Sequence, residues 1–288
     1  GIFLAALIWT FYQFPYCLKN KDIIQVNYTG EEAAVKVMSF NIRLFTPQDM
    51  GKKHWFYRAD LVVDTIEKEA PGVIGFQEVT PVQYKYLCDT LQGYDSIMTY
   101  RDKNPNSEGC PVFYLEELYT LVDKGSFWLS ETPDVPGKKG WDANNVRVAT
   151  WARIKVKENG KEFFYINTHL DHKGPTARSE GMKLIMKKFD ELNTANLPQL
   201  LTADFNTSQD DPIFTECLKT MQNARLVAPK TDNKGTYNGW VGGKTTCIDH
   251  LFLSGFDILE YKTVDQVWGK TVFISDHYPV YALAKFKK

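Results

Sequence analysis

Short apolar runs of the kind that form β-strands recur along this chain. Residues 35–42 (VKVMSFNI) alternate between apolar and other positions and then give way to polar residues, a pattern that predicts a strand leading into a loop. Residues 72–78 (GVIGFQE) are a compact apolar run that also ends in two polar residues. Further strand-like runs occupy residues 94–100, 111–123, 127–131, 146–170, 198–206, 247–255, 256–265 and 279–286. Within residues 146–170, the stretch Glu158-Asn159-Gly160 predicts a hairpin turn.

Helical periodicity separates several of these strands. Residues 55–69 place apolar side chains on one side and stop before Pro71. Thr80-Pro81 has the form of an N-cap followed by proline at the first helical position, which predicts a helix to about Leu91. Gly174-Pro175 opens a longer amphipathic segment to about Asn193, and Asp211-Pro212 predicts one more helix start.

These elements predict one large α/β (α+β) domain. The chain has 288 residues, of which 43% are hydrophobic, so a sizeable core is available. No repeat, low-complexity tract or linker is evident after residue 35. We therefore expect residues 35–288 to form a single domain with two mixed β-sheets, preceded by a separate lead-in over residues 1–34.

The lead-in is apolar over residues 2–18 (IFLAALIWTFYQFPYCL), and Gln13 and Pro15 interrupt it. It falls short of the roughly 20 residues that cross a bilayer. Two interpretations stay open. The segment is the remnant of a signal peptide or membrane anchor, or it is an apolar segment that packs on the domain. The first favours a bacterial cell-envelope or secreted location, and a cytoplasmic location stays open.

Charge and cysteine content narrow the function classes. Lysine plus arginine total 34 against 35 acidic residues, a formal net charge of −1. Tight binders of nucleic acid usually carry a basic excess or stripe, so the balance argues mildly against a processive nuclease. The five cysteines contain no CxxC pair, which fits neither a zinc site nor a disulfide-rich scaffold and favours buried thiols.

Polar residues follow many of the predicted strands directly. A site assembled from distant parts of the sequence forms naturally where strand ends share one rim. Mg²⁺ takes oxygen ligands and needs only one or two carboxylates, while histidine paired with aspartate suits proton transfer or phosphoryl stabilisation. Residues of these types stand at Asn41, Gln77-Glu78, His169 and Asp171, Asp204 and Asn206, Asp249 and Asp276-His277.

The same strings resemble a known family. In order along residues 35–288 they are SFN (39–41), QE (77–78), NTHLDH (167–172), ADFN (203–206), IDH (248–250) and SDH (275–277). The chain resembles the endonuclease/exonuclease/phosphatase superfamily. The stretches FWLSETPDVPGKKGWD (127–142) and NTHLDHKGPTARSEG (167–181) resemble an uncharacterised Bacteroides-type branch. The resemblance implies a four-layer sandwich with a deoxyribonuclease-like fold, two mainly antiparallel mixed sheets packed face to face and flanked by helices.

The resemblance also implies a metal-dependent phosphoesterase with a role for each matched position. Glu78 is expected to be the principal ligand of Mg²⁺, or alternatively of Mn²⁺. Asn41 is expected as a further ligand, either directly or through water. Asp276 is expected either as a metal ligand or as a carboxylate that supports the ligands from outside. The catalytic residues are expected to orient water or phosphate, or to stabilise the transition state: His169, Asp204, Asn206, Asp249 and His277. Whether Asp204 or the His277–Asp249 pair is the base stays open.

Weaker transfers concern the residues around the phosphate. Asn41, Glu108, Arg147 and Asp171 are assigned to phosphate binding or orientation, with Glu108 expected to orient His169. For Arg147 the alternative is an ordinary cation on a surface strand. We interpret His172 and His250 as supporting or structural groups. ADFN replaces the usual GDFN, so Ala203 adds a methyl group that we expect to be tolerated.

The substrate stays open among a phosphorylated small molecule, a lipid headgroup and a nucleic acid. A compact basic pocket from Arg147, Arg178, Lys138 and Lys139 would suit a phosphatase, whereas a deoxyribonuclease-type enzyme needs an extended basic groove. A protein that binds phosphate ligands without turnover is the alternative of another class. It is disfavoured because the metal glutamate and both catalytic histidines are present. We expect a monomer with no obligate protein partner.

Overall fold

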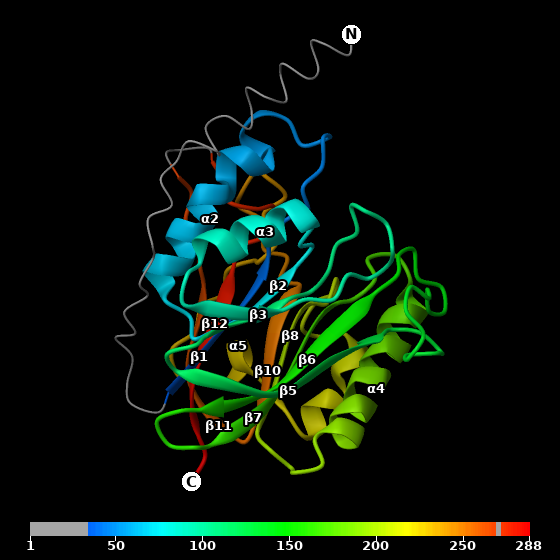
Figure 1. The fold of residues 1–288 in the computed structure, drawn as a ribbon, viewed down its shortest axis with the longest axis vertical. Helices are drawn as coiled ribbons and strands as arrows, with labels where there is room; N and C mark the ends of the chain where they lie inside the picture. Colours follow the sequence, from blue (N-terminus) through cyan, green and yellow to red (C-terminus); the bar gives the residue numbers. More distant parts are fainter. Residues whose placement is uncertain (1–33, 269–271) are drawn as a thin grey trace.

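The computed structural model describes residues 34–268 and 272–288, so the apolar lead-in over residues 1–33 lies outside it (Figure 1). Two six-stranded sheets dominate the described part. The first has the order β11-β12-β1-β2-β4-β3. Its strands are β1 (Ala34–Asn41), β2 (Val73–Gln77), β3 (Tyr94–Ile97), β4 (Val112–Leu115), β11 (Phe256–Thr263) and β12 (Val280–Phe286).

The second sheet has the order β5-β6-β7-β8-β10-β9. Each sheet holds one parallel pair, β1 with β2 and β7 with β8, and its other pairs are antiparallel. The strands of the second sheet are β5 (Tyr119–Trp128), β6 (Val148–Val156), β7 (Glu162–His169), β8 (Gln199–Asp204), β9 (Gln222–Asn223) and β10 (Asp249–Ser254).

Helices flank the two sheets, which confirms the sandwich predicted from the sequence. Helices α2 and α3 lie on one side of the molecule and α4 on the other (Figure 1). Helix α3 begins at the predicted N-cap Thr80 with proline in its first turn, and Gln83 Oε1 accepts from the Thr80 amide and hydroxyl. The helices are α2 (Trp55–Glu69), α3 (Pro81–Thr90), α4 (Pro175–Leu192) and α5 (Ala224–Val227), with 3₁₀ turns η1 (Gly51–Lys53), η2 (Pro212–Phe214) and η3 (Cys217–Lys219).

Strand β7 shows how alternation builds the layers. Phe163 and Tyr165 face the first sheet in the larger hydrophobic cluster, whereas Phe164 and Ile166 pack toward α4 in a second cluster. Successive side chains of a strand point to opposite faces, so a strand covered on both faces reads as continuously apolar. This explains the unbroken apolar run in the middle of β7.

Three sequence interpretations needed correction. The run over residues 111–123 is two strands, because the chain leaves the first sheet after β4 and enters the second at β5. The helix expected from Asp211-Pro212 is only the 3₁₀ turn η2. Cys110, Cys217 and Cys247 are buried as expected, but Cys88 is exposed.

Among the described residues no helix is long and apolar enough to span a membrane.

A buried polar network joins the two sheets near the carboxyl ends of strands β2, β7 and β8. Asn167 of β7 donates to the carbonyl of Phe76 (2.8 Å) and accepts from Gln77 Nε2 (2.8 Å) and Thr202 Oγ1 (2.9 Å). Gly75 lies against this network, and a Cβ there would clash with the Asn167 and Thr202 side chains. The network therefore fixes how closely the sheets approach beneath the rim.

Candidate active site

The rim of the sandwich collects the strand-end residues from both sheets. Asn41 and Gln77 are the last paired residues of β1 and β2, and His169 and Asp204 are the last of β7 and β8. The carboxyl ends of parallel strands share an edge, so both pairs open on the same side. Asp249 begins the antiparallel β10 opposite Asp204, which brings its carboxylate to that edge as well.

Asn41 links the two sheets at this rim. Its Nδ2 donates to Asp204 Oδ2 at 2.9 Å and lies 3.2 Å from Glu78 Oε1. The Asn41 side chain is fixed in turn because its Oδ1 accepts from the Arg43 amide at 2.9 Å. A neutral amide thus bridges two carboxylates, which lowers the repulsion between them without adding charge.

Two site residues adopt left-handed backbone angles. Glu78 has φ of 63° and Asn206 has φ of 53°. This conformation is uncommon outside glycine and costs about 1–3 kcal/mol in tight sites, so the surrounding structure must hold it. For Glu78, the Leu44 amide donates to Oε2 at 2.9 Å. For Asn206, its amide donates to Asp204 Oδ1 at 2.9 Å.

His277 is enclosed by carboxylates. Its Nδ1 lies 2.9 Å from Asp249 Oδ2, and its Nε2 lies 3.6 Å from Asp204 Oδ2. Burial alone would lower the pKa of His277, but the charges of Asp249 and Asp204 outweigh burial and raise it well above 6.5. Burial raises the pKa of Asp204 to about 7, against the opposing charge of His277. The imidazolium is therefore the stable form of His277 at neutral pH.

His169 has the opposite electrostatic environment. Its Nε2 lies 2.9 Å from Asn206 Nδ2 and 3.3 Å from Asp204 Oδ2. Burial and then the nearby Arg147 charge hold its pKa well below 6.5, so the ring is neutral. The two histidines on either side of Asp204 thus carry different charges.

Asp276 is held at the rim by its own backbone. Its carbonyl accepts from the amides of Asn238 (2.8 Å) and Gly239 (3.0 Å). The preceding Ser275 donates from Oγ to the Asn41 carbonyl at 2.7 Å, which ties this loop to the end of β1. Burial raises the pKa of Asp276, and the charge of Glu78 raises it further despite the opposing charge of His277.

The donor set suits a hard divalent cation beside Glu78 and Asp276. These neighbouring carboxylates repel one another, and a cation would relieve that repulsion with the oxygen ligands that Mg²⁺ and Mn²⁺ accept. Ligand-type atoms of Asp204, Asp249 and His277 also lie within 4.8 Å of one another. That second cluster is internally hydrogen bonded through Nδ1 of His277, which favours proton chemistry over metal binding.

Glu108 requires a correction. Its carboxylate pairs with Arg101 Nη1 and lies 3.7 Å from Arg147 Nη1, whereas Nδ1 of His169 is buried without a hydrogen-bond partner in the structure. The expected orientation of His169 by Glu108 is therefore not made here, because two guanidinium groups compete for the carboxylate. Burial and then the charge of Glu78 raise the pKa of Glu108 to about 7.

Asp171 organises the loops next to the site, with both carboxylate oxygens accepting hydrogen bonds from backbone amides. It accepts from the amides of Asn144, Asn145 and Gly174 at 2.9–3.0 Å and lies 3.4 Å from Arg147 Nε. Burial opposes ionisation, but these amide bonds outweigh it and hold its pKa well below 3.8. Asp171 thus fits an orienting role toward Arg147, which is 4% exposed and not an ordinary surface cation.

The other two histidines of the matched strings, His250 and His172, lie as the sequence interpretation placed them. His250 is buried among Phe205, Phe214 and Phe252, and its Nε2 lies 3.0 Å from the Thr207 carbonyl. His172 is exposed, with Nδ1 3.3 Å from Arg147 Nη2. The first therefore belongs to the core and the second to the edge of the site.

Sequence reasoning missed two arginines near the site. Arg101 lies in a polar loop with no motif, and only its approach to Glu108 in space reveals it. Arg58 lies in the first turn of α2, and its burial was not evident from helical periodicity. The aromatic ring of Tyr237, 5.1 Å from the His277 ring, was also missed because no string marked its loop.

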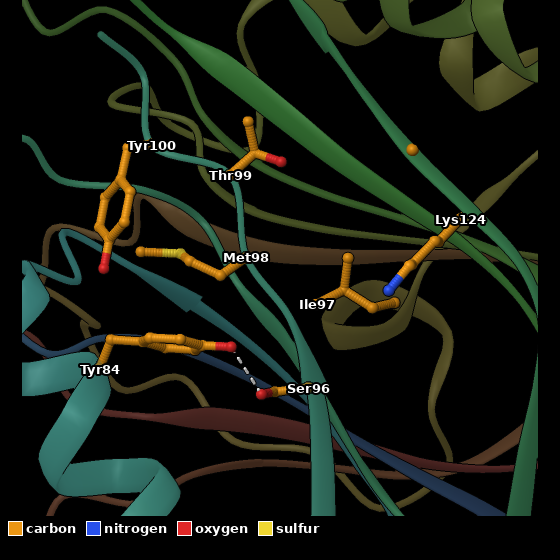
Figure 2. Close-up of a pocket in the computed structure, with 8 residues that line it drawn as sticks. Tyr84, Ser96, Ile97, Met98, Thr99, Tyr100 and Lys124 are labelled. Carbon is orange, nitrogen blue, oxygen red and sulfur yellow. Dashed lines mark hydrogen bonds between the residues drawn. The ribbon is translucent and has the colours of Figure 1, made fainter. Parts of the chain in front are cut away.

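A surface pocket of about 540 Å³ lies apart from the rim residues, at the edge of the sandwich (Figure 2). Tyr84 of α3 donates to or accepts from Ser96 across it at 2.8 Å, and Lys124 of β5 reaches it from the second sheet (Figure 2). None of its lining residues belongs to the rim cluster, so the chemistry of the strand ends, and not cavity size, identifies the candidate site.

Comparisons with known proteins agree with this assembly. Residues 38–277 match the family model described as the Endonuclease/Exonuclease/phosphatase family. An uncharacterised protein of Acanthamoeba polyphaga mimivirus is 28% identical over 270 residues, covering 85% of this chain and 98% of its own length.

Two solved structures from Bacteroides thetaiotaomicron are similar over almost their full length. A protein of the endonuclease/exonuclease/phosphatase family is 31% identical with a TM-score of 0.84, and 88% of this chain and 98% of that chain are covered. A mannosyl-6-phosphatase is also 31% identical, with a TM-score of 0.81 and coverage of 88% and 100%.

Proposed function

The chain belongs to the endonuclease/exonuclease/phosphatase family of phosphoric ester hydrolases, and from that premise we propose that it is a divalent-metal-dependent phosphomonoesterase acting on a small phosphorylated molecule such as a sugar phosphate. We assign the activity to a domain over residues 35–288. The observation that carries the proposal is the buried Asp249–His277 pair facing Asp204, opposite the carboxylates of Glu78 and Asp276.

The metal would be held by Glu78 and Asp276, with Asn41 beside them. When bound, such an ion polarises a phosphoryl oxygen and offsets its negative charge. Mg²⁺ is our first choice and Mn²⁺ the alternative, because both accept an oxygen donor set of this kind.

The residues around Asp204 would move the proton. A raised pKa for His277 means that the ring already carries its proton at neutral pH, so its Nε2–H donates toward a phosphoryl oxygen. Asp204, with a pKa of about 7, would accept the proton from the attacking water, since a base works best with a pKa near the operating pH. Asn206 would hold the phosphoryl group, and neutral His169 would lie beside the leaving oxygen, which would take up the proton that Asp204 accepts from the water.

A small substrate is favoured over a polymer by the charge around the site. Arg147 and Arg101 lie close together beside Glu108, which concentrates positive charge near His169. The net charge of −1 supplies no general basic excess for a long nucleic-acid backbone. The similarity to a mannosyl-6-phosphatase at 31% identity supports the same class.

A substrate panel tests this function directly. We would measure phosphate release from mannose 6-phosphate and p-nitrophenyl phosphate, and cleavage of bis-p-nitrophenyl phosphate and single-stranded DNA, with Mg²⁺, Mn²⁺ and EDTA. The proposal expects monoester hydrolysis to dominate and to stop in EDTA. Preferred cleavage of the diester or DNA would instead support a nuclease, and tight phosphate binding without turnover would support a silent binding protein.

A further inference from the structure

Arg58 is fully buried behind the proposed metal-binding residues. It lies on α2, with 0% of its surface exposed. Within residues 34–268 and 272–288, no carboxylate lies within ion-pair distance of its guanidinium. A buried charge without a carboxylate partner is costly unless its hydrogen-bond donors are satisfied and its charge serves the surroundings.

Main-chain carbonyls satisfy this guanidinium. Nε donates to Lys53 O at 2.8 Å and Nη2 to Arg43 O at 2.8 Å. Nη1 donates to Ile274 O at 2.9 Å and also to Ile42 O. The planar fork of arginine serves several acceptors in fixed directions, which a lysine ammonium does not reproduce.

The acceptors belong to the segments that carry the site. Ile42 and Arg43 directly follow Asn41, and Ile274 precedes Asp276 by two residues. One side chain therefore connects the end of β1 to the loop that delivers Asp276 and His277. Arg58 and Ile274 are 216 positions apart in the sequence, so no local interaction sets the spacing of the two segments.

Two indole rings complete the environment. The guanidinium carbon lies 5.2 Å from the Trp55 ring centre and 5.5 Å from that of Trp240. Trp240 belongs to the loop whose Asn238 and Gly239 amides bind the Asp276 carbonyl, so Arg58 also contacts the segment that supports Asp276 from the other side. Such cation–π contacts strengthen when the cation is removed from water.

We propose that Arg58 is a positioning residue that sets the spacing of Asn41 and Asp276 and thereby controls divalent-cation affinity. This inference rests on the proposed function for its consequence in turnover. Its direct consequence is on cation binding, which is measurable without turnover. The guanidinium acts through the backbone of the two segments and does not touch the substrate.

The test compares Arg58→Met and Arg58→Lys with the wild type. The readouts are Mn²⁺ binding by titration calorimetry and the kcat and KM for p-nitrophenyl phosphate at several Mn²⁺ concentrations. Ile185→Ala is the matched control, because Ile185 is a buried residue of α4 in the other hydrophobic cluster and its loss destabilises the protein away from the site.

We expect Arg58→Met to weaken Mn²⁺ binding at least tenfold and to lower kcat with little change in KM once Mn²⁺ saturates. Arg58→Lys should recover part of the cation affinity, and Ile185→Ala should bind Mn²⁺ as the wild type does. Wild-type Mn²⁺ affinity in folded Arg58→Met would overturn the inference. Loss of Mn²⁺ affinity in the variant, with no hydrolysis by the wild type, would uphold the inference and contradict the proposed function.

A second variant covers a failure of Arg58→Met to fold. Trp240→Leu removes one of the two rings beside the guanidinium and leaves its carbonyl partners in place. It should weaken Mn²⁺ binding in the same direction by a smaller factor. Unchanged Mn²⁺ binding and turnover in folded Trp240→Leu, together with an unfolded Arg58→Met, would assign Arg58 to stability alone and overturn the inference.

Discussion

His277 and Asp249 meet at 2.9 Å between Nδ1 and Oδ2 in the interior of the rim, with both side chains almost fully buried. The bond orients the ring so that Nε2 points to Asp204, 3.6 Å away. A carboxylate behind a histidine both fixes the ring and stabilises its charged form. The pair therefore presents a fixed cationic donor where a phosphoryl group would bind.

Replacing the carboxylate of Asp249 should weaken the ability of His277 to act as a cationic hydrogen-bond donor. Asp249→Asn keeps the shape of the side chain but removes the charge that helps to raise the pKa of His277. We expect kcat to fall by about 10²–10⁴ with KM little changed, the range typical for positioned acid–base groups. Steady-state kinetics on p-nitrophenyl phosphate measure this, and a kcat within twofold of wild type would exclude the role.

Glu78 should govern metal binding. Glu78→Gln removes a charge that raises the pKa of both Asp276 and Glu108, so the metal-free variant should be no less stable than the wild type. Saturating cation stabilises a folded protein by about 2.7 kcal/mol at 100 times Kd. We expect most of that gain to vanish in the variant, as followed by thermal unfolding with Mn²⁺ and with EDTA.

Glu131→Gln is the control for that experiment, because Glu131 is an exposed acid that accepts from the Trp141 amide and does not contact the rim. It should retain the full Mn²⁺-induced rise in melting temperature. An equal rise in Glu78→Gln would place the cation elsewhere.

His250 should make stability acid-sensitive. Burial lowers its pKa from 6.5 to about 4 in the folded protein. As the pH falls below 6.5 the unfolded chain takes up a proton that the folded chain accepts only near pH 4, so stability is lost across that window. The shift corresponds to about 3 kcal/mol. His250→Phe should lose less unfolding free energy between pH 7 and pH 4 in urea titrations, and parallel pH profiles would refute this.

Gly75 tests the packing beneath the site. A methyl group at this position would clash with the Tyr165, Thr202 and Asn167 side chains, so Gly75→Ala must push the sheets apart or break the network. Overpacking of this kind costs about 1–3 kcal/mol. Urea unfolding should show the loss. Gly181→Ala, whose added Cβ would meet nothing closer than 3.6 Å, separates the clash from the effect of glycine removal. Wild-type stability of Gly75→Ala would contradict the close approach.

Local patterns predicted much of the fold. Residues 55–69 form the predicted helix α2 because its apolar periodicity ends at a proline, and Gly160 adopts φ of 71° at the predicted turn between β6 and β7. The two-sheet sandwich and the family were also predicted correctly. The strand-end strings marked the rim residues, since each follows an apolar run directly.

What the sequence could not reveal depends on contacts between distant segments. The division of residues 111–123 between two sheets follows from how the sheets pack and leaves no mark on local periodicity. Glu108 was expected near His169, but its partner Arg101 is recognisable only in space. Arg58 looks like any helical arginine until its four carbonyl acceptors are brought together.

The central claim is that the Asp249–His277 pair beside Asp204 performs metal-dependent phosphoester hydrolysis. The most direct test is kcat/KM for p-nitrophenyl phosphate with Mg²⁺, measured for wild type, His277→Gln, Asp249→Asn and the double variant. We expect each single variant to lose at least about 10²-fold and the double variant to lose little more, because residues that act as a unit are not additive. Mg²⁺-dependent hydrolysis that persists at the wild-type rate in His277→Gln would contradict the account.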